Sequence, residues 1–392
     1  MKSILDCFKQ SKTLNALFLS NVFLSFHYAL IIYINSSFLN NFFSETQISA
    51  LYIIGSILNT LLLVNISKIL NKIGNYRTAV YMIVFEALAT IGIVMTDSHF
   101  LIGLYFTIHQ IVIPVIAFNL DVFLESATQD EEKTGEVRSI FLTLSNVTFV
   151  LAPAVVAFLL IHNNFANVYW LSLVFMFPLY YLIKKYFKNT PNSTIEHIRL
   201  KETTLEYLKN KNLYNVFIAN FLLQLFYAFM VVYTPLYLEK SMHFSWTEIG
   251  LMFTIMLLPF VIFEIPIGAM ADKKYGEKEF LTVGFIIMGL STMFISFVTV
   301  KIFWIWATIL FITRIGASFV EVTTDSYFFK QVDQRKSDVI SFYRITRPLA
   351  YIVAPILATV FLQFISFEYM FIMVGIFMVL GTRYSLALVD TK

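Results

Sequence analysis

The sequence is poor in charged residues, and this scarcity decides its broad class. Only 14% of the 392 residues are Asp, Glu, Lys or Arg, whereas 58% are hydrophobic. The mean hydropathy is correspondingly high, at +0.74. Water-soluble proteins average about 25% charged residues. The composition therefore excludes a water-soluble protein and indicates a membrane protein.

Cysteine, net charge and enzyme motifs are also scarce. The lone Cys7 excludes an internal disulfide, and a formal net charge of +3 gives no support to nucleic-acid binding. The sequence lacks the phosphate-binding loop of ATPases, the paired-histidine motif of zinc proteases, the dithiol motif and the serine-hydrolase motif. We therefore expect no enzyme activity, no cofactor and no metal site.

Long apolar runs are what the sequence has in abundance. A helix needs about 20 apolar residues to cross a bilayer. Runs of this kind lie near residues 14–38, 47–68, 78–96, 100–124, 139–161, 166–183, 213–238, 247–270, 280–299, 302–327, 339–364 and 367–389. The first run is too long for a signal-peptide core and has no cleavage site after it, so we expect it to be retained. The runs predict an all-α membrane protein with twelve transmembrane helices.

Lys and Arg are unevenly distributed among the loops. Most of the 28 Lys and Arg residues lie in residues 1–13, 68–77, 125–138, 184–212, 271–279 and 328–338. The loops on the opposite side hold only Lys240 and Lys301. Because positively charged loops stay inside, this asymmetry predicts a multi-pass protein of the cytoplasmic membrane with both termini in the cytoplasm.

The chain also repeats itself after a shift of about 200 residues. The matching pairs are Asn21 with Asn220, Tyr28 with Tyr227, Thr46 with Thr247, Val137 with Val339, and Pro153 with Pro355. A duplicated six-helix unit is a common way to build a transporter.

The longest polar stretch, residues 184–212, separates the two copies. We therefore expect an N-terminal six-helix bundle over residues 1–187, a cytoplasmic linker over 188–211, and a C-terminal six-helix bundle over 212–392. Within the linker, Ser193 and Glu196 have capping-box spacing, and apolar residues recur on one helical face, which predicts a short amphipathic helix at the membrane surface.

Two loops carry related motifs. After the eighth run the chain reads Gly268-Ala-Met-Ala-Asp272-Lys-Lys-Tyr-Gly276, and after the second it reads Ser67-Lys-Ile-Leu-Asn71-Lys-Ile-Gly74-Asn-Tyr-Arg77. The first resembles the Gly-x-x-x-Asp-x-x-Gly loop of the major facilitator superfamily, with its last glycine one residue later. The second is a degraded copy, in which Ser67 and Asn71 replace the glycine and the aspartate.

This resemblance covers essentially the whole chain. It implies the fold of that superfamily, with twelve transmembrane helices in two pseudo-symmetric six-helix bundles. It also implies a cytoplasmic gate that supports the conformational switch without touching substrate, formed by Gly268, Asp272, Gly276, Gly74 and Arg77.

Ionisable residues inside the apolar runs are costly, and each is therefore a functional candidate. The C-terminal half has three acids and three arginines, namely Glu264, Glu321, Asp325, Arg314, Arg344 and Arg347. Glu321 and Arg344 lie at similar distances from the loop between their runs, which predicts an ion pair or cytoplasmic gate. Arg314 falls near the bilayer centre, where it either binds an anionic substrate or satisfies a neighbouring acid.

The N-terminal half has buried acids and histidines but no comparably buried Lys or Arg. A buried carboxylate without a cation is suited to exchange protons. Asp121 and Glu86 are therefore the proton-coupling candidates, with His27 and Glu264 next. The resemblance implies that the fourth helix borders the transport cavity while the third is more peripheral, which ranks Asp121 ahead of Glu86. The alternatives are that Asp121 is hydrated near the cytoplasm and that the histidines only bond neighbouring helices. The substrate-cavity candidates are Arg314, His109, Tyr28 and Tyr227.

Together these observations predict a secondary transporter that moves a small solute by alternating access and is coupled to protons. We expect a monomer in membrane lipid, with a small-molecule substrate, protons and no nucleic acid as partners. Export is slightly preferred, because Ala152-Pro153-Ala-Val-Val-Ala157 is similar to a Gly-Pro element of proton-driven exporters, although a proline kink explains it as well. A transporter-like sensor without net flux and a membrane-embedded transferase are the alternatives.

Overall fold

A computed structural model describes residues 12–127, 131–190, 200–271, 276–332 and 337–389. In these residues every regular element is a helix, and twelve helices are long and apolar enough to cross a membrane. The predicted all-α membrane fold is therefore confirmed.

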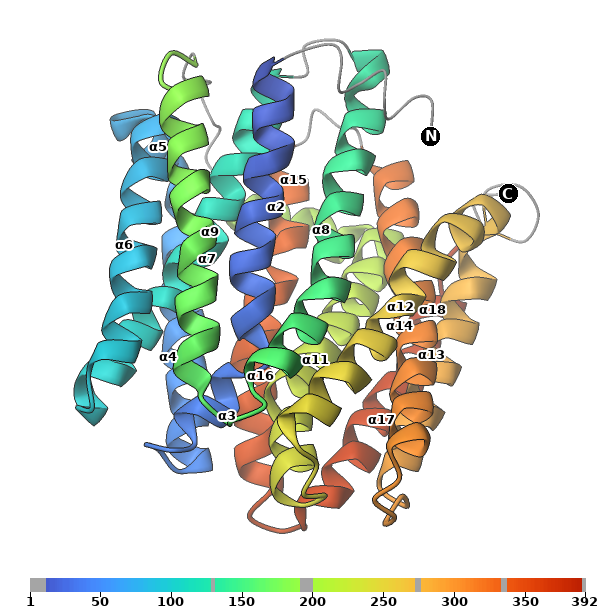
Figure 1. The fold of residues 1–392 in the computed structure, drawn as a ribbon. Helices are drawn as coiled ribbons and strands as arrows, with labels where there is room; N and C mark the ends of the chain where they lie inside the picture. The colour runs from blue at the N-terminus through green and yellow to red at the C-terminus, as the bar shows by residue number, and fades with distance from the viewer. Residues whose placement is uncertain (1–11, 128–130, 191–199, 272–275, 333–336, 390–392) are drawn as a thin grey trace. The chain divides into compact units, whose positions relative to one another are not determined.

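The spanning helices follow one another through both halves of the chain (Figure 1). Those of the first half are α2 (Lys12–Ile32), α4 (Glu45–Val64), α6 (Asn75–Met95), α7 (His99–Ala127), α8 (Glu131–Leu159) and α9 (Phe165–Tyr186). Those of the second half are α11 (Lys211–Lys240), α12 (Trp246–Met270), α13 (Glu277–Ile295), α14 (Phe303–Gln331), α16 (Thr346–Phe361) and α17 (Met370–Leu380). The last two are long enough to span only together with the short helices beside them, over Phe342–Phe361 and Phe367–Leu386. Shorter helices are α3 (Asn35–Leu39), α5 (Ile66–Ile73), α10 (Leu200–Lys209), α15 (Ser337–Arg344), η2 (Phe367–Tyr369) and α18 (Thr382–Leu386).

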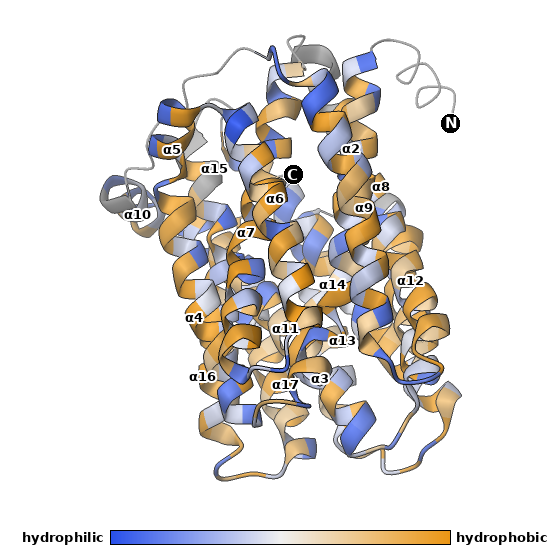
Figure 2. Cartoon of the chain, turned by 60° about the vertical axis from the view of Figure 1, so that its left-hand side comes forward, coloured by the Kyte–Doolittle hydropathy of each residue, from blue (hydrophilic) through white to orange (hydrophobic). Residues whose placement is uncertain are grey.

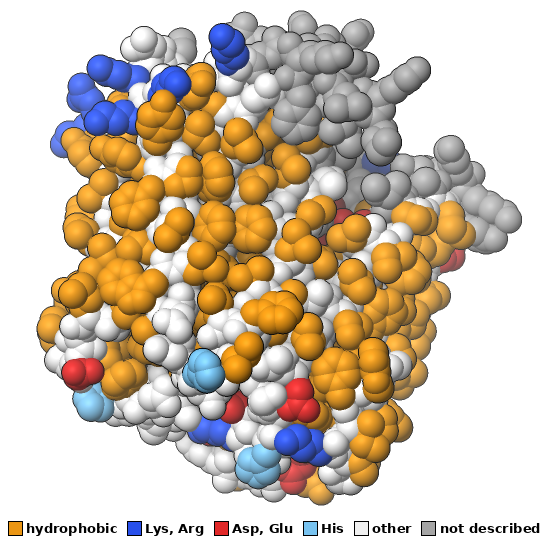
Figure 3. All heavy atoms as spheres, viewed as in Figure 1, with side chains coloured by type: hydrophobic (Ala, Val, Ile, Leu, Met, Phe, Trp, Pro, Cys, Tyr) orange, Lys and Arg blue, Asp and Glu red, His pale blue; other side chains and the backbone are white. Residues whose placement is uncertain are grey.

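Large apolar side chains cover the outer surfaces of the helices. Phe100 is 76% exposed and Phe364 is 79% exposed. Exposure of large apolar side chains to this degree is unfavourable in water and favourable in lipid. Figure 2 shows apolar residues along the full length of most helices. Figure 3 shows a broad apolar zone, with most of the visible Lys and Arg at its upper end and a few, beside Asp, Glu and His, at its lower end. This distribution is what a membrane-spanning bundle requires.

The structure divides some of the apolar runs that the sequence predicts as single helices. The second run is broken at Asn65, between α4 and α5, where the Asn65 side-chain amide donates to the carbonyl of Leu61 at 2.9 Å. Such a local bond competes with helix continuation. The eleventh run is broken at Ile345, between α15 and α16. Hydropathy averaged over a run does not show these breaks, because both lie inside runs that are apolar over most of their length.

Packing divides the chain into two compact units. The first unit comprises Met1–Phe43 and Ile54–His197, and the second comprises Ser44–Ile53 and Ile198–Lys392. The second unit thus includes the start of α4, where the Ser49 hydroxyl lies 2.9 Å from the Tyr233 hydroxyl. Nearby, Lys240 pairs with Glu45 at 3.0 Å. These two contacts hold the first turns of α4 against α11.

The internal repeat is visible in equivalent hydrogen bonds. In the first unit, Asn21 of α2 donates to the Phe141 carbonyl of α8 at 2.7 Å. In the second unit, Asn220 of α11 donates to the Thr346 hydroxyl of α16 at 2.9 Å. Each half therefore ties its first spanning helix to its fifth with an asparagine at the same position of the repeat.

Two glycines mark equivalent turns. Gly74 has φ 90° and ψ 150° before α6, and Gly276 has φ 86° and ψ 159° before α13. Only glycine adopts this region readily, because a Cβ atom would clash. The predicted motif glycines therefore have a backbone reason to be there in both halves.

Candidate functional site

Glu86 of α6 is the centre of a buried polar cluster in the first unit. Its side chain has no solvent exposure. Its Oε1 atom contacts the side chains of His27, His109 and Thr90. Its Oε2 atom is buried and has no hydrogen-bond partner among the described residues. The carboxylate thus meets all of its donors through one oxygen.

His27 of α2 joins this carboxylate to α9. Its Nε2 atom lies 2.9 Å from Glu86 Oε1, and its Nδ1 atom lies 3.1 Å from the Ser172 carbonyl oxygen. Both His27 and Ser172 are fully buried. The imidazole therefore bridges α6 and α9 from the face of α2 that packs against them.

His109 of α7 approaches the same carboxylate from the other side. Its Nδ1 atom lies 2.6 Å from Glu86 Oε1, and its side chain is 3% exposed. Thr90, one helical turn after Glu86, donates to the same oxygen at 3.2 Å. Four helices therefore contribute atoms to a single buried cluster.

The cluster lies beside the apolar core of the first unit. Leu24, Ile83 and Val112, each three residues from a cluster member on its own helix, belong to one buried apolar core. An ionisable group in such surroundings is expensive unless its partners are well placed. The cluster is therefore a strong candidate for function in the membrane.

Two imidazoles and a carboxylate are also a donor set that binds divalent metals, and their ligand atoms lie within 4.8 Å of one another. An ion about 2.1 Å from each ligand would hold tetrahedral ligand atoms about 3.4 Å apart. The two nitrogens instead lie 2.9 and 2.6 Å from the same oxygen. These are hydrogen-bond distances, so the arrangement is that of a hydrogen-bonded cluster.

The second unit buries a charge of the opposite sign. Arg314 of α14 is 1% exposed, and its guanidinium lies 4.8 Å from the Phe226 ring centre and 5.7 Å from the Tyr227 ring centre. Tyr227 in turn donates its hydroxyl to Glu321 Oε2 at 2.6 Å. Tyr227 therefore lies between the guanidinium and the carboxylate. Of the predicted substrate-cavity residues, Arg314 is thus covered by aromatic rings, and His109 belongs to the Glu86 cluster.

The predicted partners Glu321 and Arg344 are not brought together. Glu321 accepts from Tyr227, and the charged residues that act on it electrostatically are Asp325, Arg347 and Arg314. No Glu321–Arg344 pair occurs among the ion pairs between described residues. The depth estimate assumed one continuous helix, but the chain breaks at Ile345, directly after Arg344. Asp325 instead accepts from the Tyr343 hydroxyl at 3.0 Å.

The other predicted residues lie apart from the Glu86 cluster. Asp121, Glu264 and Tyr28 are half-buried, and Arg77 is exposed. At Gly268 an added Cβ would be in ordinary contact with Val322, at 3.4 Å. Asp272 lies outside the described residues, as does the predicted capping box at Ser193 and Glu196.

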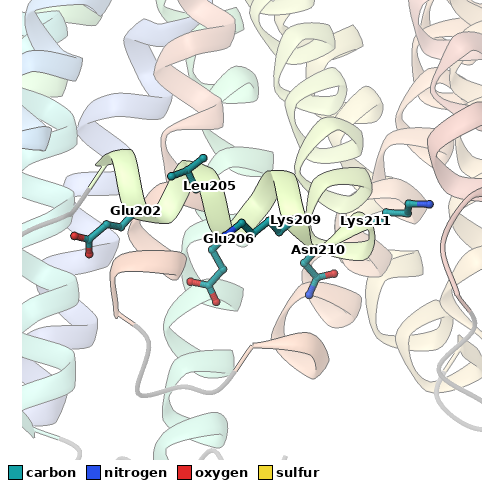
Figure 4. Close-up of a pocket in the computed structure, with 6 residues that line it drawn as sticks. All are labelled: Glu202, Leu205, Glu206, Lys209, Asn210 and Lys211. Carbon is teal, nitrogen blue, oxygen red and sulfur yellow. The ribbon is translucent and has the colours of Figure 1, made fainter.

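A groove of about 770 Å³ lies along α10, within the predicted linker. It is lined by Glu202, Leu205, Glu206, Lys209, Asn210 and Lys211. Figure 4 shows Glu202, Glu206 and Asn210 projecting from one side of the helix. The groove contains none of the buried ionisable residues, so it does not contribute to the candidate site.

Sequence analysis identified three cluster members separately but missed Thr90 and Ser172. Thr90 had a detectable signal, since it follows Glu86 by one helical turn on the same face. Ser172 acts through its backbone carbonyl, and no side-chain pattern marks that role.

The comparisons place this geometry in a known fold. A family model described as Major Facilitator Superfamily matches residues 17–249 and, in a second match, residues 216–390. A crystal structure of an autoinhibited POT family peptide transporter is 10% identical, with a TM-score of 0.75 over 97% of this chain and 98% of that one. A mutant of the nucleoside transporter NupG is 12% identical, with a TM-score of 0.75 over 96% of this chain and 99% of that one. The comparison with curated protein sequences returns no match.

Proposed function

The chain belongs to the major facilitator superfamily, and we propose that it moves a small solute across the cytoplasmic membrane by alternating access, coupled to protons. Its family, its transmembrane helices and the transporter folds that it resembles make it a multi-pass membrane transporter rather than an enzyme. Proton coupling, export as the direction of transport, and cytoplasmic termini are the parts that we propose.

The Glu86 cluster carries the proposal of proton coupling. A carboxylate and two imidazoles lie in hydrogen-bond contact inside a transmembrane bundle, where ionisable residues are rare and commonly serve ion pathways. Histidine gains or loses its charge near physiological pH. The cluster therefore combines burial with groups able to bind and release a proton.

The proposal changes the order of the coupling candidates. Glu86 is fully buried and is contacted by both histidines, whereas Asp121 is half-buried. We therefore place the coupling proton at the Glu86 cluster and keep Asp121 as the comparison residue. Tyr227, Glu321 and Arg314 in the second unit are the proposed residues for recognising the solute.

The test requires a solute first. Purified protein is screened by thermal shift against sugars, amino acids, organic anions and lipophilic cations. Compounds that stabilise it are then tested in proteoliposomes that contain a pH-sensitive dye. We expect at least one of them to move together with protons through the wild-type protein.

The matched variants are Glu86→Gln and Asp121→Asn, each of which keeps the shape of the side chain but cannot ionise. We expect Glu86→Gln to abolish proton-driven accumulation while it retains solute counterflow, and Asp121→Asn to retain both. A solute that shows counterflow in the wild-type protein without any proton movement would identify a uniporter instead.

The proposed topology has its own test, based on single cysteines in a Cys7→Ser background. A cysteine at Asn192 should react with a membrane-impermeant maleimide only from the cytoplasm, and one at Ser241 only from outside. Labelling of the Asn192 position in intact cells would reverse the assignment of the termini.

A further inference from the structure

His27 makes two contacts that a neutral imidazole cannot make at once. Its Nδ1 atom faces the Ser172 carbonyl oxygen at 3.1 Å, and a carbonyl oxygen only accepts, so Nδ1 carries a hydrogen. A neutral imidazole has one N–H, which would leave a lone pair on Nε2. Nε2 lies 2.9 Å from a carboxylate oxygen that is also an acceptor. This contact therefore requires one further proton.

We propose that His27 holds the coupling proton as an imidazolium between Ser172 and Glu86. This inference rests on the proposed proton coupling and assigns the proton to a particular atom. Glu86 Oε1 accepts from Thr90 and faces His109 as well as His27, which suits an ionised carboxylate oxygen better than a protonated one. The proton is therefore on His27 Nε2.

His109 does not need a second proton. It contacts Glu86 through Nδ1, and the neutral tautomer with hydrogen on Nδ1 makes that contact. The titratable groups around His27 are Glu86 of α6 and, through the shared oxygen, His109 of α7. Among the described residues of α8 and α9, which also pack against α2, no charged side chain contacts His27. The proton balance of the cluster thus depends on His27 and Glu86.

The proton on His27 affects how α2 packs against α6 and α9. With it, His27 ties α2 to α6 through Glu86 and to α9 through Ser172. Without it, His27 has one N–H and keeps only one of these two contacts. The other contact then places two acceptors against each other, which separates the helices that they belong to. His27 is therefore a positioning residue whose protonation decides whether α2 is held on both sides.

The protonation state can be measured without a known solute. Protein labelled with ¹⁵N-histidine is placed in lipid nanodiscs, and His27 is assigned by difference from His27→Gln. We expect both ring nitrogens of His27 to be protonated at the pH where transport is proton-driven, and one of them to lose its proton as the pH rises. In Glu86→Gln, His27 should carry a single proton, on Nδ1.

Two results would overturn the inference. One, at the pH where transport is proton-driven, is a neutral His27, with either Nε2 or Nδ1 bare, beside an ionised Glu86. The other is a neutral His27 beside a protonated Glu86, detected by the infrared carbonyl band that Glu86→Gln removes. Neither result would by itself refute proton-coupled transport, whereas absence of proton movement in the wild-type proteoliposomes would refute the proposed function and leave the His27 spectrum interpretable.

Transport provides the second readout. We expect His27→Phe, and independently His27→Gln, to reduce proton-driven accumulation by about tenfold or more, since hydrogen bonds to a charged group are lost. Counterflow should persist, and its pH profile should become flat. His162→Gln, at an exposed position, is the matched control and should keep the wild-type profile. An unchanged pH profile in both folded His27 variants would show that the proton is held elsewhere.

Discussion

The two halves of the chain repeat one fold but bury different ionisable residues at different positions of it. In the first unit the buried charge is a carboxylate on the third spanning helix, with two imidazoles around it. Counted from the matched asparagines and glycines, all three members correspond to apolar residues of the second half: His27 to Phe226, Glu86 to Met288, and His109 to Phe311.

The second unit buries a cation at another position, in addition to the Glu277 carboxylate at the start of α13. Arg314 is the one buried Lys or Arg among the described residues, and its counterpart in the first half is Val112. Glu321, which is linked to Tyr227, has the neutral Asn119 as its counterpart. The duplicated helices were therefore kept while their buried polar residues diverged.

One position of the repeat nevertheless contacts the buried charge in both halves. His27 bonds the Glu86 carboxylate, and its counterpart Phe226 places its ring against the Arg314 guanidinium. An imidazole exchanges protons near neutral pH, whereas a guanidinium stays charged. Under the proton coupling proposed above, the Glu86 cluster of the first half would change its charge during transport, whereas Arg314 of the second half stays charged.

The largest expected effect comes from copying the second half into the first. Glu86→Met alone leaves two buried imidazoles without their acceptor and should lower the free energy of unfolding by about 3–5 kcal/mol. The triple variant His27→Phe, Glu86→Met, His109→Phe should recover most of this loss, because apolar groups often replace a buried ionic cluster at little cost. Unfolding in SDS measures both, and a triple variant less stable than Glu86→Met would contradict the equivalence of the two sites.

A smaller effect is expected for the fixed charge of the second half. Arg314→Leu removes a buried cation that lies over two aromatic rings, and we expect a loss of about 2 kcal/mol or more. Because Arg314 is also a proposed solute-recognising residue, the transport rate should fall, but the remaining transport should stay pH-dependent, since the Glu86 cluster is intact. The exposed Arg383 provides the control, since Arg383→Leu should change stability by less than about 0.5 kcal/mol. A flat pH profile in Arg314→Leu would show that both halves share the proton site.

Tyr227 tests the link between the two charges of the second half. Tyr227→Phe keeps the ring over Arg314 but removes the hydroxyl that donates to Glu321. A hydrogen bond to a charged group is worth about 1.5 kcal/mol or slightly more, and we expect a loss of that size by the same measurement. Tyr81→Phe, at an exposed position, should be silent. Equal effects from the two variants would mean that the hydroxyl does not hold Glu321.

The smallest effect concerns a feature that both halves share. Gly74→Ala and Gly276→Ala each force a Cβ atom into a positive-φ turn and should each cost about 1 kcal/mol or more. Gly268→Ala, where the added Cβ meets only an ordinary contact, should be neutral or slightly stabilising, because alanine favours the helix. Unequal losses at Gly74 and Gly276, measured by thermal unfolding, would show that the two turns are not equivalent.

The fold was predictable because the bilayer dictates it. An apolar run of about 20 residues has one stable solution in lipid, and the sequence contains twelve such runs. The repeat was predictable because matching residues recur about 200 positions apart. One such pair, Asn21 and Asn220, makes the same contact between helices in both halves. The helix breaks at Asn65 and Ile345 were not, because they depend on local hydrogen bonds and packing.

The candidate site was predictable only as separate residues. His27, Glu86 and His109 each stood out as ionisable groups in apolar runs, but His27 lies 59 residues from Glu86 along the chain. Whether their side chains meet depends on how each helix is rotated about its axis, and apolar runs without a polar face do not specify that rotation. The Glu321–Arg344 prediction has the same difficulty. Counting residues from a loop gives the depth of a side chain in the membrane but not the direction in which it leaves its helix.

The contacts of the linker helix α10 determine where the chain can be split into two separately expressed polypeptides. Tyr207 donates its hydroxyl to the Val339 carbonyl at 2.8 Å, and its ring packs against Phe217 and Phe342. These contacts lie within the part of the second unit that extends from Ile198 to Lys392. Separately expressed halves should therefore be split before Leu200, so that α10 is synthesised together with the helices that cover Tyr207. A split after Lys209 would leave this side chain without its partners and expose the apolar rings beneath it.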